Sequence, residues 1–232
     1  MTMFAAALAA FILLHIGVSA TPLRGALVRG IGEGPYRGLF SLASAGALAW
    51  MIFAYAAARA APDNPTLWIS PAWTRHVAAT LVLLGFLLAV AGLLTPGPTL
   101  AGFEGALKKP DAAKGILRVT RHPFLWGVAL WGVGHLFANG EGTSVMLFGG
   151  LAVMSLLGTR SIDRKSAARM PAEWAPFRDA TSNVPFAAIL KGRNRLAVGE
   201  MAIPLLAALA AFGAMVWFHR VLFGVAPFAF GA

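Results

Sequence analysis

The chain has 232 residues, of which 58% are hydrophobic and only 12% charged, with a net charge of +10 and no cysteine. Soluble domains carry about 25% charged residues, so this composition indicates an integral membrane protein. The absence of cysteine excludes disulfides, thiolate metal sites and cysteine nucleophiles. The basic residues lie in short loops between apolar segments, without RNA-binding or zinc-finger motifs, so we expect no nucleic-acid partner.

Six apolar segments follow one another along the chain, and each approaches the roughly 20 residues that a bilayer core requires. They cover residues 3–20, 38–58, 77–95, 124–138, 143–159 and 201–218. We therefore predict an all-α fold, a polytopic membrane helix bundle of about six transmembrane helices, in a single domain over residues 1–232. The first segment lacks a preceding basic region, so we expect it to be retained rather than cleaved as a signal peptide.

The distribution of Lys and Arg predicts the orientation of these segments. The first, third and fifth loops hold most of the basic residues, whereas the second and fourth loops hold few or none. Because cytoplasmic loops are enriched in Lys and Arg, we expect a multi-pass protein of the bacterial inner membrane with both termini outside. The fifth loop, residues 160–199, is then a basic cytoplasmic surface loop. Trp174 and Phe177 are expected to anchor a helix of this loop at the lipid headgroups.

Two histidines lie inside apolar segments, where ionisable residues are costly and indicate function. His15 lies in the first segment, roughly 8–12 Å from the cytoplasmic boundary, and His135 lies in the fourth, roughly 14–18 Å deep. A helix tilt of about 20° can close that difference. Two neutral imidazoles that face each other across an apolar interior suit the axial positions of a haem iron. The alternative is that each histidine hydrogen-bonds a neighbouring helix.

The triplet Arg121-His122-Pro123 precedes the fourth segment. Proline is favoured at the first position of a helix, so we expect a helix to begin here at the cytoplasmic boundary. Its free amides would suit an anion such as a haem propionate or a cofactor carboxylate. Interfacial snorkelling of Arg121 and His122 is the alternative. His122 and His135 are about 20 Å apart along the helix, so they do not share one small site.

Two acidic residues have basic neighbours in the sequence. Glu33 precedes the second segment, where it could pair with an arginine of the same helix face, such as Arg37. Asp163 lies between Arg160 and Arg164, which predicts a surface ion pair rather than a catalytic carboxylate.

The chain resembles the NnrU family of bacterial membrane proteins and the plant zeta-carotene isomerases related to it. The resemblance covers nearly the whole chain, and its motifs are specific in combination. They are His15, Gly32-Glu33 with Tyr36-Arg37, Arg121-His122-Pro123 with Leu130-Trp131 and His135, Asn139-Gly140, Trp174 with Phe177, Thr181-Ser182, Pro185-Phe186-Ala187-Ala188-Ile189 and Gly192-Arg193.

The resemblance implies a haem b protein with His15 and His135 as the ligands of the haem iron and the residues of catalysis. In the isomerase branch, the redox state of the iron gates a cis-to-trans change in a carotenoid double bond. The bacterial branch is linked instead to nitric oxide and nitrite metabolism. The plant enzymes carry a cysteine three residues before the second histidine, where this chain has Gly132, so a ligand switch to sulfur is not open to it.

The residues and the resemblance leave three functions open. The first is a haem-dependent isomerase or oxidoreductase that acts on a lipophilic small molecule or on nitrogen oxides, with an electron donor as partner. The second is a membrane methyltransferase of the isoprenylcysteine or phospholipid type, which would bind S-adenosylmethionine at Arg121 and His122. The third is a non-enzymatic haem-binding accessory of a nitrogen-oxide reductase. For all three functions we expect the helices to be surrounded by the lipid bilayer.

Overall fold

The computed structural model describes residues 1–228, and this part of the chain is helical without any β-strand. The long helices are α1 (Thr2–Ile12), α3 (Glu33–Arg59), α4 (Thr74–Leu94), α5 (Pro123–Ala138), α7 (Gly150–Arg169) and α10 (Val198–Phe223). The shorter ones are α2 (Pro22–Ile31), α6 (Gly142–Ser144), α8 (Pro171–Ala180) and α9 (Ala187–Leu190). Two 3₁₀ turns, η2 (Glu104–Lys108) and η3 (Gly115–Arg118), and two π-helical segments, η1 (Leu13–Val18) and η4 (Val145–Gly149), complete the elements.

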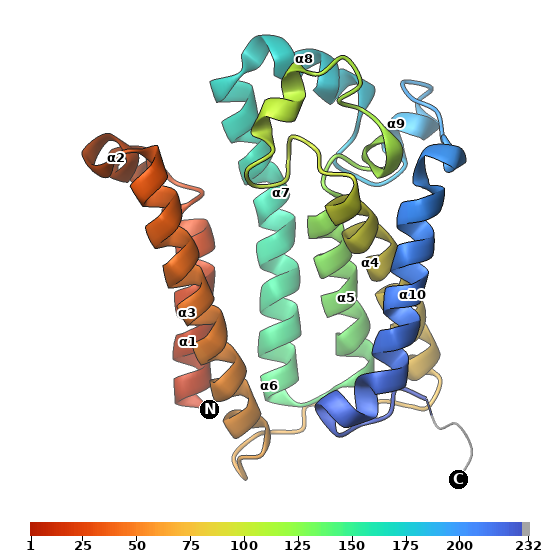
Figure 1. Cartoon of the computed structure of the whole chain (residues 1–232). Helices are drawn as coiled ribbons and strands as arrows, with labels where there is room; N and C mark the ends of the chain where they lie inside the picture. Colours follow the sequence, from red (N-terminus) through yellow and green to blue (C-terminus); the bar gives the residue numbers. More distant parts are fainter. Residues whose placement is uncertain (229–232) are drawn as a thin grey trace.

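The long helices run along one common axis and alternate in direction (Figure 1). At one end lie α2, α8, α9 and the connection between α4 and α5, and at the other end lie Met1 and the end of α10 (Figure 1). Every predicted apolar segment is helical. The predicted turn over residues 139–142 is also present, because α5 ends at Ala138 and α6 begins at Gly142.

Four helices of the described chain are long and apolar enough to cross a membrane. They are α3, α4, α10 and the continuous helix Gly142–Arg169. The first segment reaches that criterion only together with α2, from which it is bent by 80°. Helix α5 has 16 residues, which is shorter than a full span. The structure is therefore an all-helical membrane bundle, while six crossings and the outside placement of both termini stay predictions.

Helices α4 and α5 pack closely because both carry glycine where they meet. A Cβ atom on Gly85 would lie 2.8 Å from the carbonyl oxygen of Gly127, and one on Gly127 would lie 2.6 Å from the Cβ of Ala89. Small residues of this kind let the backbones of membrane helices approach each other closely. By contrast, α10 exposes large apolar side chains such as Trp217 and Val221, 80% and 83% exposed, as a lipid-facing surface would.

The basic region after the fifth segment differs from the expectation. Residues 160–169 continue α7, so the polar stretch begins as helix rather than as a surface loop. Trp174 and Phe177 lie on α8 but do not anchor it to headgroups, because each is only 3% exposed and both pack against Leu107 of η2. Helix α8 is therefore attached to the bundle through its own apolar residues.

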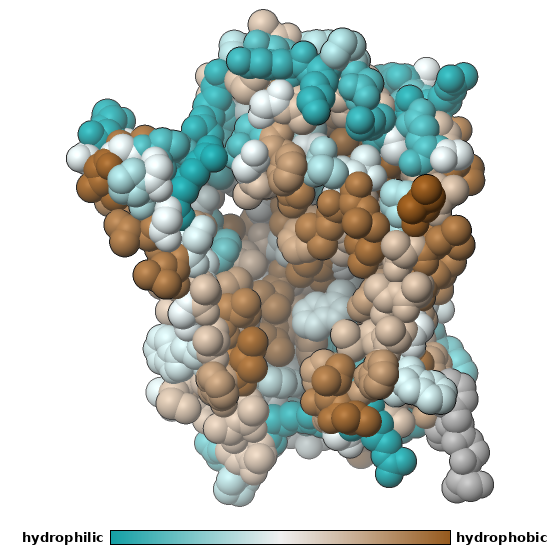
Figure 2. Space-filling model, viewed as in Figure 1, coloured by the Kyte–Doolittle hydropathy of each residue, from teal (hydrophilic) through white to brown (hydrophobic). Residues whose placement is uncertain are grey.

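Helices α1 and α3 pack together and lean away from α7 toward the end that carries α2 (Figure 1). The space-filling view shows a hollow between this pair and the rest of the molecule (Figure 2). Apolar residues dominate the middle of this face, and hydrophilic residues gather at its two ends (Figure 2). This separation of the helices opens a large cavity.

Candidate functional site

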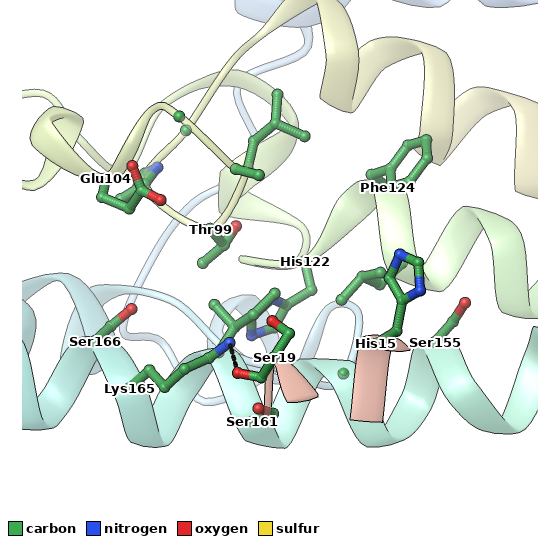
Figure 3. A pocket seen from close by; sticks show the side chains of 18 of the residues that line it. His15, Ser19, Thr99, Glu104, His122, Phe124, Ser155, Ser161, Lys165 and Ser166 are labelled. Atoms are coloured by element: carbon green, nitrogen blue, oxygen red, sulfur yellow. Dashed lines mark hydrogen bonds between the residues drawn. The ribbon is translucent and has the colours of Figure 1, made fainter. Parts of the chain in front are cut away.

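The cavity has a volume of about 870 Å³ and lies between the α1–α3 pair, α7, the start of α5 and the chain around Thr99. Its apolar part is lined by side chains such as Ile16, Phe40, Phe124 and Met154. Its polar part is lined by Ser19, Arg24, Tyr36, Glu104, His122, Ser161 and Lys165. His15 also lines the cavity and lies on the same side as Phe124 (Figure 3).

At the wall of this cavity, Asp163 joins two residues of the Arg121-His122-Pro123 triplet. Its carboxylate accepts hydrogen bonds from Nε and Nη2 of Arg121 at 2.9 and 2.6 Å, and one from Nε2 of His122 at 2.6 Å. The Arg121 side chain is only 11% exposed, the Asp163 side chain 21%, and the His122 side chain is fully buried. The cluster is thus internal, and the expected surface ion pair of Asp163 with Arg160 or Arg164 is absent from the ion pairs of residues 1–228.

The local sequence fixes His122 in place. Pro123 is the first residue of α5, and the preceding turn is tied back by Thr120, whose oxygen accepts from the His122 amide at 3.2 Å. The Thr120 hydroxyl in turn donates to the Asn183 carbonyl at 2.6 Å. The Thr99 hydroxyl donates to the carbonyl oxygen of Arg121. These contacts orient the His122 side chain toward Asp163 on one side and the cavity on the other.

The hydrogen bond to Asp163 decides the tautomer of His122. A carboxylate only accepts, so Nε2 carries the hydrogen and Nδ1 of the neutral ring keeps a lone pair. Burial lowers the pKa of His122, and the pull of Asp163 in the opposite direction only partly offsets this. Within the described chain Nδ1 of His122 is buried and has no hydrogen-bond partner, although the residue lines the cavity. A buried acceptor without a partner calls for an explanation in terms of a ligand or water.

Asp163 is the residue of this candidate site that the sequence did not reveal. It is the single acidic residue of α7. A lone carboxylate in this helix is the sequence feature that could have pointed to it. Arg121, which it binds, also lies with its guanidinium 5.6 Å from the ring centre of Trp174. Arg121 is therefore engaged on two sides, and neither Arg121 nor His122 faces the headgroups as snorkelling would require.

His15 and His135 share one unusual arrangement. In each ring Nδ1 lies 2.8 Å from the carbonyl oxygen four residues earlier, Phe11 for His15 and Trp131 for His135. A carbonyl only accepts, so both rings carry the hydrogen on Nδ1 and present the lone pair of Nε2. Neither Nε2 atom makes a hydrogen bond to any residue between 1 and 228. An Nδ1–H bond to a backbone carbonyl is how metal-binding histidines are commonly oriented.

Aromatic rings and π-helical turns surround both histidines. The His15 ring lies 4.4 Å from the ring centre of Phe11 and 5.5 Å from that of Phe40, and His135 is stacked on Phe148 at 4.5 Å. His15 lies in η1, and Phe148 lies in η4. These are the two π-helical segments of the described chain, and such segments are frequent at functional sites. Hydropathy and charge patterns in the sequence do not predict them.

The structure brings His15 and His122 to the same cavity, whereas His135 lies outside its lining. No group of three or more His, Asp or Glu residues within 1–228 forms a metal site. A haem iron needs only two axial ligands from the chain, and two histidines with free Nε2 atoms fit that requirement chemically.

Comparison with known proteins identifies the family. The description "NnrU protein" matches residues 3–227, which is nearly the whole chain. The 15-cis-zeta-carotene isomerases of Zea mays and Arabidopsis thaliana, both chloroplastic, are each 35% identical over 82 residues, which is 35% of this chain. That segment spans only 22% of each plant enzyme. No solved structure matches the chain significantly. The chain belongs to the NnrU family of membrane proteins.

Proposed function

We propose that this chain is an integral membrane haem b protein in which His15 and His135 would hold the haem iron, and that it isomerises a double bond of a lipid-soluble polyene. The observation that carries the proposal is the shared geometry of the two histidines, each with Nδ1 bonded to its own helix and Nε2 free. The similarity to the plant isomerases supports the substrate class. Both histidines lie on helices of the membrane bundle, where a lipophilic substrate has direct access from the bilayer.

The helix packing supports a common site for the two rings. A Cβ atom on Gly132 would lie 2.6 Å from the carbonyl oxygen of Phe148, and one on Gly150 would lie 3.3 Å from Ile12. One short stretch of chain, from Phe148 to Gly150, thus contacts both α5 and α1.

The two histidines lie on either side of this shared level. His15 is three residues beyond Ile12, within the π-helical η1, and His135 is three residues beyond Gly132, about 4.5 Å further along α5. Helices α1 and α5 run in opposite directions (Figure 1). Because side chains lean toward the start of their own helix, both rings are directed back toward the same level. The Nδ1 contacts to carbonyls four residues earlier agree with that direction.

A bound haem would supply a redox-active iron centre. The chain would contribute the two imidazoles, and the carbonyls of Phe11 and Trp131 would fix their orientation. The rings of Phe40 and Phe148 would cover the site and exclude water, which favours a polyene over a hydrophilic substrate.

The experiment is the absorption spectrum of the protein purified in detergent from haem-replete cells. We expect a Soret band that is lost in His15→Ala and in His135→Ala. His76→Ala and His219→Ala are the matched controls and should keep the band, because His76 lies in the first turn of α4 and Nδ1 of exposed His219 is bonded to the Val225 carbonyl. A colourless wild-type preparation, or equal loss in all four variants, contradicts the proposal.

Turnover is tested separately on the same samples. Protein with reduced haem should convert 15-cis-zeta-carotene to its trans form, whereas oxidised protein should not, as measured by chromatography of the extracted pigment. Bound haem without conversion would exclude the isomerase activity on that substrate. The nitrogen-oxide chemistry expected from the bacterial branch would then be tested by the spectral shift on addition of nitric oxide.

A further inference from the structure

The polar part of the cavity contains several buried polar atoms without partners. Within residues 1–228, six buried side-chain atoms make no hydrogen bond, and three of them belong to residues that line this cavity. These three are the hydroxyls of Tyr36 and Ser161 and Nδ1 of His122. Buried polar groups are almost always satisfied in folded proteins. Their concentration at one cavity therefore indicates a polar group of a ligand at this place.

Lys165 adds a positive charge to the same part of the cavity. Its ammonium group makes no ion pair with any residue in the described chain and donates to the Ser19 carbonyl at 3.3 Å (Figure 3). The residue is only partly exposed. A half-buried ammonium group without a carboxylate partner favours binding of an anion.

The other charges around the opening do not cancel that of Lys165. The Glu33 carboxylate forms ion pairs with Arg24 at 2.6 Å, Arg37 at 2.8 Å and Arg169 at 3.8 Å. One negative charge is therefore shared among three guanidinium groups. Glu104 lines the cavity, but its closest ion pair is with Arg37, at 3.8 Å. The opening is therefore positively charged overall.

The remaining lining sets the shape of the ligand. Below the polar groups the cavity continues between apolar side chains of η1, α3, α5 and α7, including Ile16, Phe40, Phe124 and Met154. Figure 3 shows His15 and Phe124 on one side of the view and His122 and Lys165 nearer its middle. A molecule with an apolar chain and a polar head at one end matches this division.

We propose that this cavity binds a single-chain anionic lipid. Its phosphate or carboxylate head lies against Lys165, a hydroxyl of the head donates to Nδ1 of His122, and its chain lies among Ile16, Phe40 and Phe124. Asp163 and Arg121 are positioning residues, because they hold the His122 ring with Nδ1 toward the cavity. This site goes beyond the proposed function, since none of these contacts requires haem.

The test is calorimetric titration of the full chain in a neutral detergent with three lipids that carry the same oleoyl chain. Lysophosphatidate carries a phosphate and a hydroxyl, 2-hydroxyoleate carries a carboxylate and a hydroxyl, and monoolein carries hydroxyls without charge. We expect lysophosphatidate to bind at least about tenfold more tightly than monoolein. The comparison of 2-hydroxyoleate with lysophosphatidate distinguishes the two anionic groups: stronger binding of 2-hydroxyoleate assigns the site to carboxylates, and weaker binding assigns it to phosphates.

Lys165→Met and Arg164→Met form a matched pair, because both remove one positive charge from α7 but exposed Arg164 does not line the cavity. Lys165→Met should lower the affinity for lysophosphatidate about tenfold and leave that for monoolein unchanged, whereas Arg164→Met should change neither. Equal affinity for lysophosphatidate and monoolein, or an equal loss in the two variants, overturns the proposal.

The placement of the head group near the unpartnered atoms of Tyr36 and His122 is tested through Tyr36→Phe and His122→Gln, so that one variant remains if the other fails to fold. His122→Gln should weaken lysophosphatidate binding, and Tyr36→Phe should do so to a smaller extent. Unchanged affinity in both overturns the assignment of the head group to this end of the cavity. The Soret band is recorded on every sample, so absence of haem and absence of lipid binding are distinguished.

Discussion

Asp163 and His122 are 41 residues apart in the sequence, yet Nε2 of His122 donates to the Asp163 carboxylate at 2.6 Å. The same carboxylate is held by two nitrogens of Arg121. This contact joins the start of α5 to α7 and fixes which ring nitrogen of His122 meets the cavity. It therefore connects the stability of the bundle with the chemistry of the cavity that His122 lines.

Asp163→Asn should destabilise the protein strongly. The change removes the negative charge from a partly buried cluster and leaves the Arg121 guanidinium without its partner, which costs about 3 kcal/mol. We expect a clearly lower midpoint of thermal unfolding in detergent, followed by circular dichroism. Asp179→Asn is the control, because its pair with Arg178 is exposed, with Asp179 64% accessible, and should cost less than about 1 kcal/mol. Equal shifts in the two variants would show that the Asp163 cluster contributes no more than a surface pair.

The buried ring of His122 should make stability depend on pH. Burial lowers its pKa below the ordinary value of 6.5, against the partial opposition of Asp163 and with the support of the Arg121 charge. As the pH falls, the unfolded chain therefore binds the proton before the folded chain does. Stability is complete above the unfolded pKa and is lost as the pH falls from there toward the lowered folded pKa.

The measurement is the unfolding midpoint between about pH 8 and about pH 5.5 for the wild type and for His122→Gln. The wild-type midpoint should fall over the acidic part of this range, and the variant should show a smaller fall, because it lacks the group that titrates. Parallel curves for the two proteins would mean that other groups cause the pH dependence.

Much of the architecture could be predicted from local sequence. The apolar runs are long enough to require helices in a membrane, and each predicted run is helical. The predicted pairing of Glu33 with Arg37 is confirmed at 2.8 Å, since residues four apart lie on one face of a helix. The end of α7 could not be found in this way. Hydropathy falls after residue 159, but the helix continues to Arg169, where its polar side chains have partners inside the protein: Asp163 binds Arg121 and His122, and Lys165 lines the cavity.

The candidate site was only partly predictable, because some of its contacts join residues that are far apart in the sequence. His15 and His135 stand out as ionisable residues in apolar runs, and Arg121 and His122 stand out before a proline. The partner of His122 could not be read from sequence, because Asp163 has arginines as immediate neighbours and its true contacts are distant in the chain. The ligation of iron by His15 and His135 stays a prediction, as does the binding of S-adenosylmethionine in the alternative function.

Trp174→Ala distinguishes a buried tryptophan from a headgroup anchor. Trp174 is 3% exposed and packs against Phe177 and Leu107, so its truncation should cost about 3–5 kcal/mol. Trp217 on α10 is 80% exposed, and Trp217→Ala should change the unfolding midpoint little. An interfacial role of Trp174 would give the opposite pattern, with near-normal stability and weaker attachment of α8 to lipid vesicles.

Gly127→Ala tests the close contact of α4 and α5, which holds the start of α5 and therefore His122 in place. A Cβ atom on Gly127 would lie 2.6 Å from the backbone oxygen of Gly85, so the helices must separate. Overpacking of this kind costs about 1–3 kcal/mol, and we expect a lower unfolding midpoint in detergent. Gly213→Ala on α10 is the control, since a Cβ there meets nothing within 4 Å and alanine favours helix by about 1 kcal/mol. If Gly127→Ala were as stable as Gly213→Ala, the α4–α5 contact would be looser than its glycines imply.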